Sequence, residues 1–402
     1  MNRPALPFIE FIVLVALMFS MIAFAIDSML PAFPEIARDL DLGDMNRAQL
    51  VITTFFLGTG FGQLLSGPLS DSVGRKPVIL GGLVLFVAAC IGAWYSQSLE
   101  MLLVMRFVQG LGVSAPRTVT LALVRDLYSG RVMAQVMSLS MVLFVLVPAV
   151  APLVGQTIMQ AWGWRSIFLA FIVFAFVGAL WLGLRQPETL APGHRRPLRR
   201  ITYVAAMREV AASRIVMTYT AVLACGFGSI FAYLSSAQQI YVGVFGVGDN
   251  FPYYFAAVAL VSGTSGFLNA SLVTRFGMRL LASSAFGLMV VVTVLFIAVA
   301  AFGGLSSDAL FRIFLVWSAI SFFIPGLTFG NLNSLAMEPM GHIAGMAAAI
   351  MGALSTLLGF VIAVPIGLAF DGTLMPMLIG MSLCNAAAFA LMLSDPKRRQ
   401  AA

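Results

Sequence analysis

Residues 66–80, SGPLSDSVGRKPVIL, separate two long apolar runs of the chain. This short segment combines a proline, a carboxylate, two glycines and two adjacent cations. Gly67 and Pro68 lie where the preceding helix is expected to end, and Gly74 permits a turn with positive φ. Adjacent cations are typical of loops on the cytoplasmic side of a membrane. The segment therefore predicts a tight inner loop between two membrane-spanning helices.

The composition of the whole chain supports a membrane location. Of 402 residues, 60% are hydrophobic and 10% are charged, whereas about 25% are charged in an ordinary soluble domain. Apolar runs long enough to cross a bilayer of roughly 30 Å recur throughout. Twelve such runs are expected, at residues 8–30, 48–68, 77–97, 100–123, 134–159, 163–184, 213–239, 251–273, 278–302, 308–333, 343–369 and 373–393. We therefore predict an all-α, multi-pass protein of the inner membrane.

The net charge of +7 is explained by membrane topology. With the N-terminus inside, 17 of the 23 cations fall in inner loops and tails and 4 in outer loops, while Arg106 and Arg117 lie within spans. Cytoplasmic loops collect Lys and Arg. We therefore expect both termini to be cytoplasmic, and we expect no nucleic-acid partner.

The longest polar interruption, RQPETLAPGHRRPLRR, follows the sixth apolar run. It predicts two six-helix halves, residues 1–185 and 213–402, joined by a cytoplasmic linker at residues 186–212. NASLVTRFGMRLL resembles the opening segment and lies about 200 residues later. Gly277 corresponds to Gly74, and Thr274 replaces the carboxylate of Asp71. This pattern indicates a parallel duplication, a plan common among transporters.

Asp71 is not needed for topology, because it adds a negative charge to a basic inner loop. It could cap the N-terminus of a neighbouring helix. It could also pair with Arg125 or Arg131 near the inner end of the fourth span.

The opening segment resembles the signature of the major facilitator superfamily, Gly-x-Leu-x-Asp-x-x-Gly-Arg-Lys. The matching residues are Gly67, Leu69, Asp71, Gly74, Arg75 and Lys76. Over essentially its whole length the chain is similar to the bicyclomycin and chloramphenicol resistance branch of the drug:proton antiporters. The segments that carry this likeness are DSMLPAFPEIARDL, RFVQGLGVSAPRTVTLALVRDLY, APLVG and GNLNSLAMEPMGHIAGMAAAIMGAL.

The resemblance implies a major facilitator fold and specific roles for its motif residues. In that family the loop signature latches the two halves on the cytoplasmic side. The corresponding gate residues here are Gly67, Asp71, Gly74, Arg75, Lys76 and Arg125.

The antiporter signature of span five corresponds here to residues 151–156. Pro152 and Gly155 match it as helix-packing residues. Ala151 and Gln156 stand where the family has its outer glycines.

Charged residues within spans are functional candidates, because each costs roughly 2.5–3.5 kcal/mol at mid-membrane on insertion scales. Asp27, near the outer end of span one, and Arg106, about two turns into span four, are expected at similar depth and could pair. We assign both to proton coupling, and the resemblance adds weight to Arg106. The alternative is that Asp27 is interfacial and that the arginines pack structurally.

The substrate site is expected to be apolar and aromatic, with a few polar groups. Its candidate residues are Phe24, Arg117, Tyr233, Gln238, Tyr254 and Asn331. Each of them could serve helix packing instead.

These patterns favour a proton-coupled multidrug efflux transporter that exports small lipophilic or amphiphilic compounds by alternating access. The expected partners are a small-molecule substrate, protons and the lipid bilayer, and we expect a monomer. No ATP-binding motif is present in the sequence, and we expect no enzymatic activity, metal or cofactor. The alternatives are a proton-coupled or passive transporter of a specific metabolite and, outside transporters, a polytopic receptor or a membrane enzyme.

Overall fold

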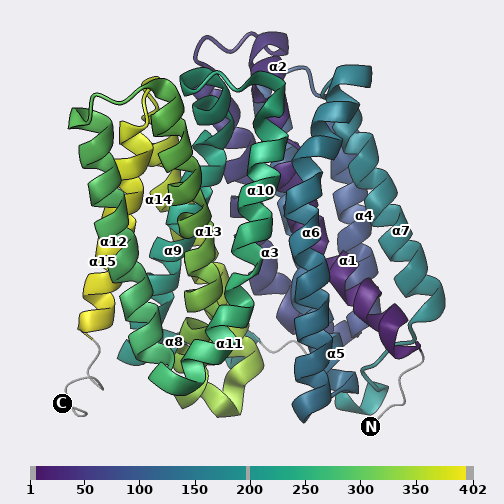
Figure 1. The fold of residues 1–402 in the computed structure, drawn as a ribbon. Helices are drawn as coiled ribbons and strands as arrows, with labels where there is room; N and C mark the ends of the chain where they lie inside the picture. The colour runs from purple at the N-terminus through teal and green to yellow at the C-terminus, as the bar shows by residue number, and fades with distance from the viewer. Residues whose placement is uncertain (1–5, 196–199, 395–402) are drawn as a thin grey trace. The chain divides into compact units, whose positions relative to one another are not determined.

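The computed structural model describes residues 6–195 and 200–394. Within these ranges the regular structure is helical, and no strand is present. Twelve helical segments of this part of the chain are long and apolar enough to cross a membrane. The predicted all-α membrane fold with twelve spans is therefore confirmed (Figure 1).

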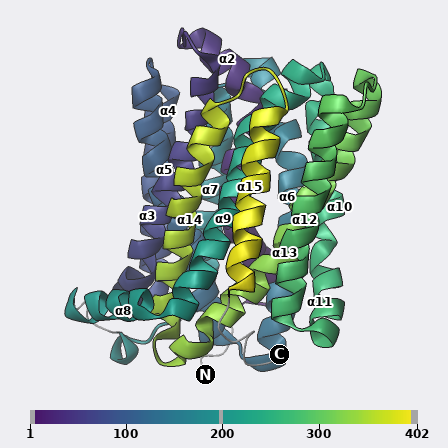
Figure 2. The ribbon, with the colours of Figure 1, turned by 90° about the vertical axis from the view of Figure 1, so that its left-hand side faces the viewer.

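The chain divides after Ala205 into two compact units. The division falls inside α8 (Arg200–Ala212), within the linker expected at residues 186–212. This helix runs crosswise to the long α9 that follows it (Figure 2).

The first unit contains the first six spans. Its helices are α1 (Phe8–Asp27), α2 (Phe33–Asp39), α3 (Leu50–Val73), α4 (Arg75–Trp94), α5 (Leu99–Leu127), α6 (Gly130–Trp162) and α7 (Ser166–Arg185). α5 packs against both α3 and α4, while α1 packs against α6 and α7. At Gly82 and Gly112 the backbones of α4 and α5 approach so closely that an added Cβ would meet the opposite carbonyl oxygen. Such small residues let membrane helices pack backbone to backbone.

The second unit contains the other six spans. Its helices are α9 (Arg214–Gln238), α10 (Phe251–Gly263), α11 (Ser265–Phe276), α12 (Met278–Phe302), α13 (Ser307–Met337), α14 (Ala344–Leu368) and α15 (Met375–Leu393). α9 packs against α14 and α15, and α12 packs against α13 and α15. An aromatic cluster at Tyr233, Tyr241, Phe314 and Trp317 joins α9 to α13.

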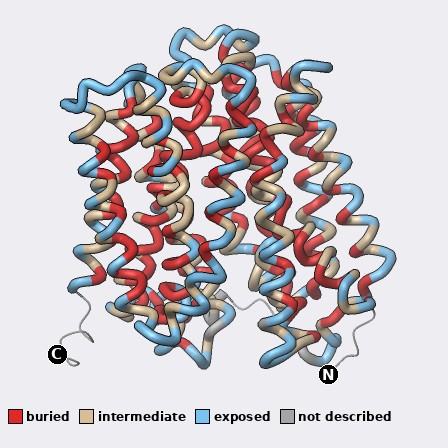
Figure 3. The backbone as a smooth tube through the Cα atoms, in the orientation of Figure 1, coloured by how far each residue is buried: buried red, intermediate tan, exposed pale blue. Residues whose placement is uncertain are grey.

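The burial pattern matches helices in lipid. In Figure 3 buried and exposed positions alternate along the helices, so one side of each helix is covered and another is open. Exposed positions on α4 and α7 include Val84, Ile91, Val173 and Phe176. Large apolar side chains exposed on long helices are what a lipid-facing surface requires.

α3 continues past Pro68 to Val73, so the prediction that it ends at Gly67 and Pro68 is wrong. A proline inside a helix leaves the carbonyl four residues earlier without its N–H donor. Here that carbonyl belongs to Leu64, and the Tyr203 hydroxyl from α8 donates to it at 2.9 Å. A side chain distant in the sequence thus replaces the lost hydrogen bond, and the helix ends at Gly74 instead.

The eighth span, expected as one helix over residues 251–273, is interrupted between α10 and α11 at Thr264. The Thr264 hydroxyl donates to the Val261 carbonyl at 2.7 Å. The hydroxyl of Ser262 donates to the Val258 carbonyl at 2.6 Å. Such bonds, next to Gly263, compete with the helical backbone ladder and locate the break.

Candidate functional site

The loop between α3 and α4 is closed by a carboxylate from the segment after α7. Gly74 has a φ of 121°, which a residue with a side chain rarely adopts. A Cβ at Gly74 would also lie 2.6 Å from a carboxylate oxygen of Glu188. That carboxylate accepts hydrogen bonds from the backbone N–H groups of Arg75 and Lys76, both at 3.0 Å. Glu188 therefore satisfies the first N–H groups of α4 and complements the dipole of that helix.

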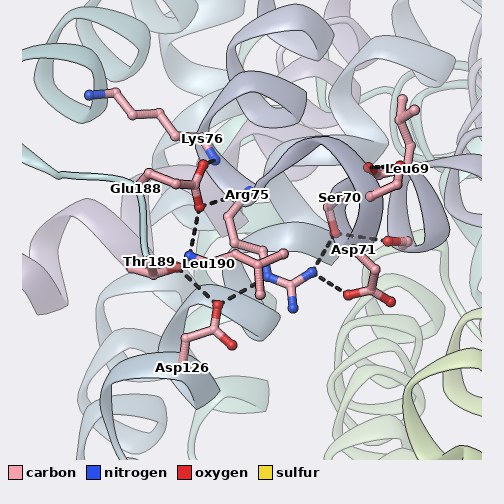
Figure 4. A network of polar contacts seen from close by, with 11 residues as sticks. Leu69, Ser70, Asp71, Arg75, Lys76, Asp126, Glu188, Thr189 and Leu190 are labelled. Carbon is pink, nitrogen blue, oxygen red and sulfur yellow. Dashed lines mark hydrogen bonds and ion pairs between the residues drawn. The ribbon is translucent and has the colours of Figure 1, made fainter. Parts of the chain in front are cut away.

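Arg75 is the central cation of this loop (Figure 4). Its Nη1 donates to Asp71 at 2.5 Å and to the Ser70 hydroxyl at 2.8 Å, and its Nε donates to Asp126 at 3.0 Å. The Thr189 hydroxyl also donates to Asp126, at 2.9 Å. One guanidinium therefore joins the end of α3 to the end of α5.

The expected pairing of Asp71 with Arg125 or Arg131 is corrected by this geometry. Asp71 lies in the last turn of α3, which continues to Val73, and it pairs with Arg75, four residues later, across the turn at Gly74. Arg125 is exposed on the last turn of α5.

The other predicted gate residues are also placed. The Gly67 carbonyl accepts a hydrogen bond from the Ser70 hydroxyl at 2.8 Å. The Lys76 ammonium donates to the Gly183 carbonyl at the end of α7, at 2.6 Å. Glu188 and Asp126 belong to the network but were not predicted from the sequence. Asp126 lies within the RDLY segment used for the resemblance, so its position offered a signal, whereas Glu188 was assigned only to the linker.

The duplicated loop of the second unit also turns at a glycine with positive φ but has different side-chain chemistry. Gly277 has φ 77° and ψ 158°, close to the ψ of 159° at Gly74. Thr274, at the position of Asp71, is exposed and donates to the Ser271 carbonyl at 3.0 Å. Arg279 donates to the Tyr219 hydroxyl at 3.0 Å. The duplication therefore preserves the turn without a counterpart of the Asp71–Arg75 pair, while Arg279 lies 3.7 Å from the carboxylate of Glu338.

Asp27 ends α1 and is 4% exposed. Among the residues that the structure describes, no hydrogen bond or ion pair joins its carboxylate to another group. The expected ion pair with Arg106 is therefore not formed. An acidic side chain without a fixed cation, inside a membrane span, marks a functional site by default.

Arg106 lies at the level predicted for it but is held by backbone oxygens. Its guanidinium donates to the Ala25 carbonyl at 3.1 Å, to the Val51 carbonyl at 3.0 Å and to the Gln109 side chain at 2.7 Å. It also lies over the Phe55 ring, 4.4 Å from the centroid. Arg106 is completely buried. Because it binds the carbonyl of Ala25, two residues before Asp27, it positions the end of α1. Gln109 was not predicted.

The span-five signature contacts the residue next to Asp27. A Cβ built at Gly155 would lie 2.0 Å from the Ser28 carbonyl oxygen. Only glycine allows α6 to approach the end of α1 this closely. The Ser28 hydroxyl is buried without a hydrogen-bond partner in the described chain, and Pro152 is buried one turn before Gly155. One predicted helix-packing residue, Gly155, therefore packs against the residue that follows the candidate proton carrier.

Arg117 lies over a phenylalanine ring, as Arg106 does, but it lacks the hydrogen bonds that hold Arg106. It is exposed on α5, and its guanidinium lies 5.7 Å from the centroid of the Phe19 ring. In the described ranges it makes no hydrogen bond or ion pair. Glu10, in the first turn of α1, binds Arg185 at 2.9 Å and accepts a hydrogen bond from the Trp181 indole at 3.0 Å.

The remaining predicted substrate residues make contacts within their own units. Phe24 packs against Phe171 and Phe174 of α7. Tyr233 is completely buried, with its hydroxyl 3.1 Å from that of Tyr241. Each of these side chains has a packing role in the structure.

Two polar candidates are also buried in the second unit. Gln238 is 5% exposed. Asn331 is equally buried and donates to Asn269 and to the Leu327 carbonyl, both at 2.8 Å. Tyr254 is half-buried, and its ring packs edge-on against Phe311. No group of three or more metal-binding side chains occurs in the part of the chain that the structure describes.

Within residues 6–195 and 200–394, twelve apolar helical segments in two units define a polytopic membrane protein. The family model of the Major Facilitator Superfamily matches residues 13–364. The chain belongs to this superfamily and is a transporter, not an enzyme.

Two relatives and one solved structure are similar to the chain over most of its length. It is 32% identical over 358 residues to an uncharacterized MFS-type transporter, YdgK, of Bacillus subtilis, covering 88% of this chain and 87% of that one. It is 29% identical to a bicyclomycin resistance protein homolog of Haemophilus influenzae, covering 96% and 95%. The crystal structure of a D-xylose-proton symporter superposes with a TM-score of 0.72 at 15% identity, covering 96% and 98%. The resemblance to the resistance branch is confirmed, as is the expected location in the inner membrane.

Proposed function

We propose that the protein exports small lipophilic or amphiphilic compounds in exchange for protons, by alternating access, with both termini in the cytoplasm. Its relatives with names in antibiotic resistance support the direction of transport. Their identity to this chain, about 30%, leaves the coupling chemistry to be argued from the residues of the chain itself.

The observation that carries the proposal is the buried carboxylate of Asp27 without an ion pair among the described residues. A carboxyl group that has no fixed cation can gain or lose a proton without breaking a salt bridge. It can therefore hold a proton in one state of the transport cycle and release it in the other. The nearby charge of Arg106 is fixed by three hydrogen bonds, so it remains in place while Asp27 changes its protonation.

The packing around Asp27 supports the same role. Arg106 holds the backbone two residues before it, and Gly155 packs against the backbone one residue after it. Both contacts are with main-chain atoms of α1 and Ser28, so neither Arg106 nor Gly155 binds the Asp27 carboxylate. We assign Asp27 to proton carriage and Arg106 to positioning of the α1 end.

We assign the network of Asp71, Arg75 and Asp126 to the cytoplasmic gate. Its members lie at the ends of α3, α4 and α5, where a change in helix position would break or form their contacts. Its role in latching follows from the family resemblance.

The energy required is available from a membrane potential. A potential of about 100 mV supplies about 2.3 kcal/mol per charge, which corresponds to a roughly fifty-fold concentration ratio. Such a ratio is sufficient for useful efflux of a toxic compound.

The direct test uses inverted membrane vesicles and a panel of antibiotics and of cationic, neutral and anionic dyes. An acid-inside gradient should drive accumulation of at least one compound, and a protonophore should abolish it. Vesicles without the protein supply the control. Faster entry that stops at equal concentrations and is unaffected by the protonophore would show a passive transporter instead and would contradict the proposal.

A further inference from the structure

Arg117 is a charged residue within a span of the first unit, and the coupling and gate assignments do not use it. It lies nine residues before Asp126 on α5, which is about 13 Å further into the membrane. An arginine remains charged in proteins. At this depth such a charge must face the protein interior or water, and it needs a counter-charge or several hydrogen-bond acceptors.

Arg106 provides an internal comparison on the same helix. The two arginines are 11 residues apart, so they lie within about 20° on one face and about 16 Å apart along the axis. Arg106 is completely buried, with three acceptors. Arg117 is exposed, and among the described residues its contact is the Phe19 ring. The guanidinium of Arg106 therefore has hydrogen-bond acceptors within the protein, whereas that of Arg117 has none among the described residues.

The packing of α5 shows that Arg117 is turned away from the lipid-facing side. α4 packs against α5 at Gly112, five residues before Arg117 and about 140° around the helix. α4 in turn exposes Val84 and Ile91, as a lipid-facing helix does. Arg117 therefore projects from the side of α5 opposite this helix.

A second donor lies next to Arg117. Thr120 is buried one turn further along α5, and its hydroxyl has no hydrogen-bond partner in the described part of the chain. Residues three apart on a helix are neighbours. A guanidinium and a hydroxyl together offer several donors to a carboxylate or phosphate, for which guanidinium geometry is well suited.

We propose that Arg117 and Thr120 bind the anionic head group of an amphiphile, with the Phe19 ring contacting its apolar part. The inference rests on the proposed transport function, which it narrows to acidic amphiphiles as a substrate class. The same chemistry could come from a transported organic acid or from a phospholipid head group. The missing counter-charge of Arg117 is then supplied by the ligand.

Binding of three matched probes to the purified protein in phosphatidylcholine nanodiscs tests this proposal. The probes are laurate, its methyl ester and dodecylamine, which differ mainly in the charge of the head group. Laurate should bind at least tenfold more tightly than the ester or the amine. Arg117→Gln should remove this preference, and Arg117→Lys should keep part of it. Thr120→Val should weaken the binding of laurate but not that of the ester or the amine.

Arg312→Gln, at an exposed position of the second unit, is the matched control and should leave the preference unchanged. Thermal unfolding of each variant distinguishes lost binding from lost folding. Equal affinities of the wild type for laurate and its ester would overturn the proposal, as would unchanged laurate binding in a folded Arg117→Gln protein.

Nanodiscs containing phosphatidylglycerol separate the two sources of the anion. If a lipid head group occupies the site, this lipid should compete with laurate in the wild type but not in Arg117→Gln. If the site serves a transported acid, laurate should bind equally in both nanodiscs and accumulate in inverted vesicles. Proton-driven transport without any preference for anions would refute this inference alone, whereas anion binding without proton-driven transport would refute only the proposed function.

Discussion

Two groups of charged side chains in the first unit differ in their partners: one group forms ion pairs, and the other does not. At the ends of α3, α4 and α5, Arg75 meets Asp71 and Asp126, and Glu188 caps the start of α4. Within the spans, Asp27 has no ion pair in the described chain and Arg106 is held by neutral oxygens.

This difference distinguishes a gate between conformations from a proton carrier. Paired charges at the membrane surface can lock helix ends together, and separating them changes the energy of one conformation relative to another. An unpaired carboxylate inside a span stabilises little, because its burial is costly unless it is compensated. Such a residue is better explained by a change in protonation than by stability. The following predictions test this division.

The largest loss of stability is expected at Arg106. Arg106→Gln leaves the Ala25 carbonyl at the end of α1 without its donor, and a buried unsatisfied group costs about 1–3 kcal/mol. It also removes a second, charged donor from the Val51 carbonyl, which keeps its helical N–H donor in α3. The thermal unfolding midpoint should therefore fall further than in Arg75→Gln, whose carboxylates remain accessible to water. In the protein that does fold, the pH at half-maximal substrate binding should shift, whereas Arg117→Gln should leave it unchanged. Equal shifts in both variants would show that the two arginines form one coupled network.

A smaller effect, on rate instead of folding, is expected at Asp71. Asp71→Ala leaves Arg75 bound to Asp126 and Ser70, so ligand binding should persist while turnover slows several-fold. Glu100→Ala removes another exposed acid that pairs with an arginine and should transport normally. A normal transport rate in Asp71→Ala would count against a latch.

The smallest effect is expected at Tyr203. Tyr203→Phe removes the hydrogen bond to the Leu64 carbonyl, at a cost of about 0.5–1.5 kcal/mol. Burial raises the pKa of the Tyr203 phenol, so its stabilising contribution is complete below the ordinary value of about 10 and is lost as the pH rises through the higher folded value. The difference in unfolding midpoint between wild type and variant should therefore be present at pH 8 and shrink at alkaline pH. Tyr95→Phe, at an exposed tyrosine, is the control, and equal midpoints for Tyr203→Phe and wild type at pH 8 would contradict the assignment.

The spans and the turn at Gly74 could be predicted because they follow from local patterns. Long apolar runs specify membrane helices regardless of their neighbours, and a positive φ requires a residue such as glycine. The end of α3 could not be predicted in this way. Its continuation through Pro68 depends on Tyr203, a residue more than a hundred positions away that replaces a hydrogen bond.

The partners of the candidate site were harder to predict than its members. Asp27 and Arg106 were placed at one depth by counting residues from the helix ends. Their pairing was wrong because Arg106 binds main-chain carbonyls, which every residue carries and which leave no signal in the sequence. Glu188 was missed for a related reason, since it recognises backbone N–H groups across 113 residues of chain.

The most direct test of the central claim is proton release when a transported compound binds to the detergent-solubilised protein. In weakly buffered solution with a pH indicator, wild type should release about one proton per bound ligand, because a single carboxyl group changes state. Asp27→Asn should bind the compound and release none, whereas Asp71→Asn, the same acid-to-amide change in the paired network, should release protons as wild type does. Undiminished release by a folded Asp27→Asn protein would contradict the assignment of Asp27 as the proton carrier.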